Sequence, residues 1–97
     1  MFSQVYYLLR SKVDGSYVVA HPPVAGDRSN SGYLLMFREH FDALSYVNKH
    51  AADVADRFAV ESIPASQIKS LLNRWQFAGL GIVNEPLLPS IEFITKA

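Results

Sequence analysis

The stretch "YLLMFREHFDALSYVNKHAADVADRF", Tyr33 to Phe58, contains the two elements from which the fold can be predicted. Residues Tyr33 to Arg38 are almost continuously apolar, which is typical of a strand buried on both faces near the middle of a sheet. From Glu39 to Phe58, apolar side chains recur at steps of three and four, the spacing of an amphipathic helix. We therefore predict a central strand followed directly by a long helix.

The expected helix has an apolar stripe and a charged face. We expect the stripe to pack on the sheet, and its members are Phe41, Leu44, Val47, Ala51, Val54 and Phe58. Tyr46 falls on the charged face, one turn before His50. Because tyrosine is enriched at protein interfaces, we predict a partner-binding patch made of Tyr46, His50 and Arg57. A lone exposed tyrosine is the alternative.

The rest of the chain predicts four or five further strands and a second, shorter helix. The expected order is strand-strand-strand-helix-strand-helix-strand-strand, at residues 4–12, 16–21, 33–38, 39–58, 58–63, 64–79, 80–84 and 91–96. Two helices packed on a mostly antiparallel or mixed sheet of five to six strands belong to the α+β class. Residues 1–97 are expected to form a single domain.

Four local predictions accompany this order. Asp14-Gly15 suits a type I′ turn between the first two strands, because both residues tolerate positive φ. Gly79 is expected to cap the second helix, and Trp75 is expected in the core or at the edge of a groove. If the first hairpin lies at a sheet edge, its run "VYYLL" is a place for edge-to-edge pairing.

Composition narrows the classes of partner. Nine Lys and Arg balance nine Asp and Glu, so the formal net charge is zero. No long-range field steers such a chain to nucleic acid or to an anionic membrane, and we expect neither as a partner. Weak charge repulsion favours self-association, so a protein partner is expected, above all a second copy in a homodimer.

The chain contains no cysteine, which removes disulfides, thiolate zinc sites and cysteine nucleophiles. This fits a cytoplasmic protein. The first residues, "MFSQVYYLLRSKV", show no basic segment ahead of an apolar run, so no signal peptide is expected. No stretch approaches the roughly 20 apolar residues that span a bilayer.

The residues that could carry chemistry are few. His40 and His50 would point about 80° apart on one helix, so they cannot share an ion, and we expect no metal site and no cofactor. His21, Asp27 and Arg28 lie in or next to the polar loop at 22–32, which could form a small ligand-binding or catalytic pocket. A solvated loop without chemistry is the alternative.

Five segments in this order carry a resemblance to a known family: "GYLLMF" followed by "DALSYV", then "IPASQIKSLL", then "GLGIVNEP" leading to "SIEF". Together they resemble the amino-terminal domain of the SseB (enhanced serine sensitivity) proteins over about Tyr33 to Phe93. The chain departs from that pattern in having Glu85 between Asn84 and Pro86. The resemblance implies an interaction or regulatory module and brings no catalytic residues. Gly79, Asn84 and Pro86 match its turn and are interpreted as structural.

Two functions remain open at this point. The first is a non-enzymatic α+β module that binds protein, itself or another chain, through a sheet edge or the Tyr46 face. The second is a small-ligand-binding protein or small enzyme with its pocket under the 22–32 loop. Neither composition nor fold class names a ligand.

Overall fold

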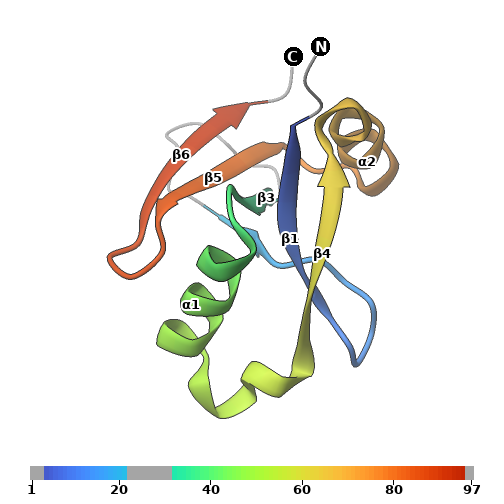
Figure 1. Cartoon of the computed structure of the whole chain (residues 1–97). Helices are drawn as coiled ribbons and strands as arrows, with labels where there is room; N and C mark the ends of the chain where they lie inside the picture. Colours follow the sequence, from blue (N-terminus) through green and yellow to red (C-terminus); the bar gives the residue numbers. More distant parts are fainter. Residues whose placement is uncertain (1–3, 22–31, 96–97) are drawn as a thin grey trace.

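The computed structural model of this chain describes residues 4–21 and 32–95, and Figure 1 shows their arrangement. The strands are β1 (Val5–Ser11), β2 (Val19–Ala20), β3 (Tyr33–Phe37), β4 (Phe58–Pro64), β5 (Gly79–Glu85) and β6 (Ser90–Thr95). The helices are α1 (His40–His50) and α2 (Ile68–Trp75), with the 3-10 turns η1 (Ala52–Arg57) and η2 (Ala65–Gln67). The predicted α+β class and element order are confirmed.

The described strands form one mixed sheet with the order β4-β1-β3-β5-β6. The short strand β2 is outside this order and pairs with β3. The central strand β3 is antiparallel to β1 and β2 and parallel to β5. All five of its residues are buried. The prediction of a central strand covered on both faces is therefore confirmed.

The two helices lie on opposite faces of the sheet (Figure 1). The cluster on the α2 face contains Leu8, Leu34, Met36, Ile63, Ile68, Leu71, Leu72, Phe77 and Ile82. The cluster on the α1 face contains Leu9, Leu35, Phe37, Ala43, Val47 and Val83. Because side chains alternate along a strand, neighbouring residues of β1 and β3 serve different clusters.

The prediction for the first helix is wrong in its length and in its buried face. α1 ends at His50, and Ala51 leaves helical geometry at φ −147° and ψ 46°. The residues that α1 buries are Ala43 and Val47, whereas Phe41 is 74% exposed. The small Ala43 side chain lets the helix backbone approach the sheet closely, and this contact, rather than the widest apolar stripe, sets the rotation of α1.

The first hairpin differs from the predicted type I′ turn. Only Gly15 has positive φ, at 77°. The carboxylate of Asp14 instead accepts hydrogen bonds from the backbone N–H (3.0 Å) and hydroxyl (2.7 Å) of Ser16, which is an Asx turn. The second strand begins only at Val19. β1 is an interior strand, so the condition for edge pairing of "VYYLL" is not met.

Gly79 does not cap the second helix. Gln76 ends α2 with the left-handed conformation φ 58° and ψ 40°, and its backbone N–H bonds back into the helix. Gly79 instead begins β5, where a Cβ atom would collide with the carbonyl oxygen of Ile94 in β6. The glycine therefore allows close approach of the last two strands.

Candidate functional site

Within the predicted Tyr46 patch, His50 and Arg57 are exposed, whereas Tyr46 is half-buried. Tyr46 packs into the α1-face cluster, with its ring 5.3 Å from that of Phe37 and 4.7 Å from that of His50. Burial raises the pKa of the Tyr46 hydroxyl above its ordinary value. The prediction placed Tyr46 on the wrong side because it assumed the Phe41 stripe as the buried face.

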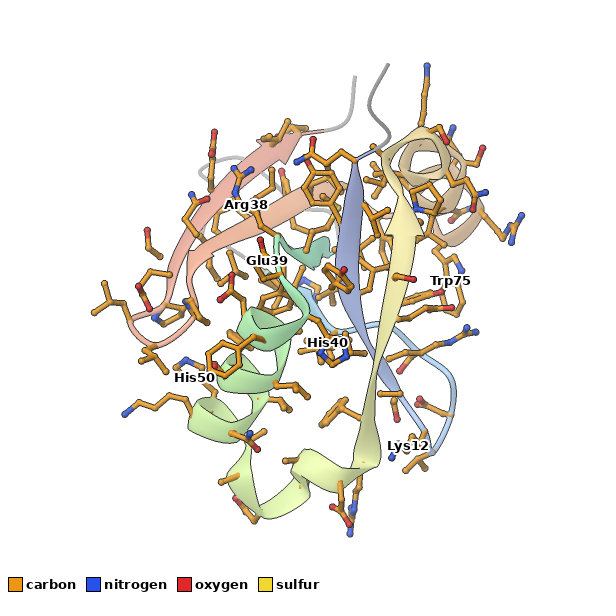
Figure 2. All side chains as sticks on the ribbon, in the orientation of Figure 1. Lys12, Arg38, Glu39, His40, His50 and Trp75 are labelled. Carbon is orange, nitrogen blue, oxygen red and sulfur yellow. The ribbon has the colours of Figure 1, made fainter. Side chains whose placement is uncertain are left out.

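His50 and Arg57 have separate surroundings. The Nε2 atom of His50 lies 3.0 Å from the carbonyl oxygen of Pro86, and this contact joins the end of α1 to the β5–β6 turn (Figure 2). Arg57 lies at the end of η1, where its carbonyl accepts a hydrogen bond from the backbone N–H of Lys12 at 2.8 Å. The structure thus brings Tyr46 and His50 together and places Arg57 in another element.

The residues of the alternative pocket are only partly described. His21 is exposed directly after β2, while Asp27 and Arg28 lie outside the described residues.

His40 stands edge-on to Tyr7, with the two ring centres 5.8 Å apart. Within residues 4–21 and 32–95, no three His, Asp or Glu side chains gather in a way that could hold a metal ion. In the same ranges, no helix combines the length and apolar character needed to cross a membrane.

A groove of about 750 Å³ opens beside α2, between that helix and the strands β1 and β4. We call it the α2 groove. Its floor is apolar and consists of Leu8, Ile63 and Leu71. Its walls carry the polar and aromatic side chains Arg10, Tyr17, Glu61, Ser62, Gln67, Ser70, Arg74 and Trp75.

The groove follows from the short length of α2 and the alternation of the strands. Leu8 and Arg10 share one face of β1, and Glu61 and Ile63 share the same face of β4. α2 has eight residues, about 12 Å of helix, so it covers the apolar member of each pair and leaves the charged member open. Sequence reasoning missed this site, although charged residues at inward positions of predicted strands were a usable signal.

Arg10 is held in place by three contacts at the open end of the groove. Its Nε donates to the carbonyl oxygen of Gly15 at 2.8 Å, and its Nη1 lies 3.4 Å from Oε1 of Glu61. Its guanidinium also lies 4.9 Å from the ring centre of Tyr17. The charge of Arg10 is therefore compensated, and the first hairpin is anchored over the sheet.

The aromatic rings of Tyr17 and Trp75 line one side of the α2 groove. Trp75 stands edge-on to Tyr17 at 5.2 Å and stacks on Phe77 at 6.1 Å, and it remains 39% exposed. Figure 2 shows it at the end of α2 beside β4, which confirms the predicted groove edge. Burial, and next the nearby Glu61 carboxylate, raise the pKa of the Tyr17 hydroxyl above its ordinary value.

A second surface of interest is the strand β6, which lies at the edge of the sheet and, among the strands of residues 4–21 and 32–95, pairs with β5 alone. Phe93 is 39% exposed and Ile94 is 44% exposed, on opposite faces of the strand. The hydroxyl of Tyr33 lies 2.9 Å from Oγ1 of Thr95, and the Tyr33 ring stands edge-on to Phe93 at 5.5 Å. β6 therefore contacts β3 through its Phe93 and Thr95 side chains and carries one partly exposed apolar side chain on each face.

Comparisons with family models, with curated proteins and with solved structures each find no match for this chain. The resemblance to the SseB family stays a prediction.

Proposed function

We propose that this chain is a non-enzymatic protein-interaction module that forms a homodimer through the edge strand β6. The observation that carries the proposal is the combination of a strand edge with which no described segment pairs and two partly exposed apolar side chains, Phe93 and Ile94. An edge strand presents a row of unpaired N–H and C=O groups, which is a template for another strand.

The opposite edge of the sheet, β4, is protected against such pairing. It ends in Pro64, which has no N–H to donate. No large apolar residue of β4 is exposed. β6 contains no proline, and Glu92 is its single charged residue. Of the two edges, β6 therefore supports strand addition better.

The homodimer we propose joins the two sheets into one continuous sheet. An antiparallel pair centred on Phe93 would place this ring opposite its own copy, and aromatic cross-strand pairs contribute roughly 0.2–1 kcal/mol. The zero net charge adds little repulsion between two copies. The absence of cysteine is compatible with the cytoplasmic location that we propose for this dimer.

Sedimentation velocity over a range of protein concentrations tests the dimer. We expect the native chain to shift from monomer to dimer as its concentration rises, and Ile94→Lys to weaken that shift at least tenfold. The lysine puts a charge at the pairing edge, as natural sheets do to prevent association. Leu44→Lys is the matched control, because Leu44 is 40% exposed on α1 and far from β6 in sequence.

Two results would contradict the proposal. One is a native chain that stays monomeric up to millimolar concentration. The other is a dimer that Leu44→Lys weakens as much as Ile94→Lys does, which would move the interface to α1. Circular dichroism of both variants shows whether each retains the fold, so a loss of association can be separated from unfolding.

A further inference from the structure

The α2 groove contains one positive charge that the protein does not itself neutralise. Arg10 is paired with Glu61, as described above. Arg74 lines the same groove and forms no ion pair with any residue in the described part of the chain. Its charge, like that of Arg10, partly offsets the rise in the pKa of the Tyr17 hydroxyl. The groove therefore has an excess of about one positive charge.

The polar side of the groove runs from the last residue of η2 along one line of α2. Gln67, Ser70 and Arg74 follow one another at steps of three and four, which places them on a single face. The amide and hydroxyl groups of the first two can donate hydrogen bonds beside the guanidinium. Together they suit an oxyanion that reaches the groove from solvent.

The apolar side suits a flat ring system. Leu8, Ile63 and Leu71 form a floor that is nearly free of solvent, and the rings of Tyr17 and Trp75 stand beside it. A volume of about 750 Å³ is within the usual range of small-molecule sites. The groove can therefore cover a ligand of one or two rings.

We propose that the α2 groove binds a small aromatic monocarboxylate, with the carboxylate on Arg74 and the ring between the apolar floor and Trp75. A monoanion fits better than a phosphate dianion, because Glu61 lies in the same wall and repels a second negative charge. A planar guanidinium also matches a carboxylate in two parallel hydrogen bonds. This site is independent of the β6 dimer.

The experiment is a calorimetric titration of the full chain with 2-naphthylacetate and with its neutral amide, 2-naphthylacetamide. We expect the acid to bind with a dissociation constant of about 1 mM or below, as the ligand efficiency of a molecule of this size suggests. The amide shares the ring and lacks the charge, so we expect it to bind about tenfold more weakly.

Variants test whether the charge of Arg74 causes the difference in affinity between the acid and the amide. Arg74→Gln should reduce binding of the acid to the level of the amide and leave the amide unchanged. Arg57→Gln is the matched control, since Arg57 is also exposed but lies in η1, outside the groove. Arg74→Lys should recover part of the preference for the acid, because it restores the charge without the planar fork.

Three results would overturn the proposal. The first is no binding of the acid at about ten times the expected dissociation constant. The second is equal binding of acid and amide, or an equal loss in Arg57→Gln. The third is tighter binding of N-acetyl-Gly-Phe than of 2-naphthylacetate, which would make a peptide carboxyl terminus the occupant in place of a small molecule.

Discussion

The effect of adding a side chain at two glycines of β5 depends on the atoms that face them from the neighbouring strands. Gly79 and Gly81 both face β6, but their surroundings differ. A Cβ at Gly79 would meet the backbone of Ile94, while at Gly81 it would meet the side chains of Leu35, Ile91 and Phe93 at 3.1–3.2 Å. Backbone atoms cannot move aside without breaking the β5–β6 pairing, whereas side chains can adjust by a few tenths of an ångström.

We therefore predict that Gly79→Ala lowers the free energy of unfolding by about 1–3 kcal/mol, the cost of forcing an extra methyl into a packed site. Gly81→Ala is the matched control and should cost less than Gly79→Ala. Urea unfolding followed by circular dichroism measures both. Equal losses in the two variants would show that the close approach of Gly79 to Ile94 is not maintained in solution.

At the scale of elements, the first helix shows how a sheet selects among the faces that a helix offers. Val47 and Phe41 belong to the same predicted apolar stripe, yet Val47 is 6% exposed and Phe41 is 74% exposed. The helix also stops at His50, where its ring reaches the carbonyl oxygen of Pro86. The position of α1 thus depends on the β5–β6 turn, which lies far away in the sequence.

From this difference we predict unequal effects of two truncations in α1. Val47→Ala should lower the free energy of unfolding by about 2 kcal/mol, because it removes buried methyl groups and leaves a cavity. Phe41→Ala should change it by less than about 0.5 kcal/mol, as is usual for exposed positions. Thermal or urea unfolding distinguishes the two, and a larger loss for Phe41→Ala would contradict the rotation of α1 described above.

At the scale of the whole molecule, the sheet separates two apolar clusters, and β3 connects them. Leu34 and Met36 point to the α2 face, while Leu35 and Phe37 point to the α1 face. Opening β3 would expose both clusters at once. β6 contributes the partly buried Ile91 to one cluster and is otherwise exposed.

Native-state hydrogen exchange should therefore separate the centre of the sheet from its edge. We expect the amides of Leu34 to Met36 to exchange only through global unfolding and those of Phe93 and Ile94 to exchange faster, through local opening. If β6 forms the dimer interface, the protection of its amides should rise with protein concentration. Uniform protection across β3 and β6 in a dilute monomer would contradict this order of stability.

Sequence alone determines the α+β class, the order of elements and the central place of the Tyr33 strand, because local periodicity and an unbroken apolar run report burial directly. It also places Trp75 at a groove edge. Its errors at Phe41, Tyr46 and Gly79 share a cause, since each position depends on a contact made by a distant segment. The error at the Asp14 turn is local, because the Asp14 carboxylate bonds to Ser16.

Only the tertiary structure decides which face of α1 is buried, which strand lies at an edge and which side chains meet in the α2 groove. Arg10 and Tyr17 belong to the first hairpin, but nothing in the local sequence marks Glu61 and Arg74 as their neighbours. Strand order and register bring them together, and these are non-local properties of the chain. The candidate site therefore depends on strand order and register, which are set by contacts between distant segments, while the helices and strands that form it can be predicted from local sequence.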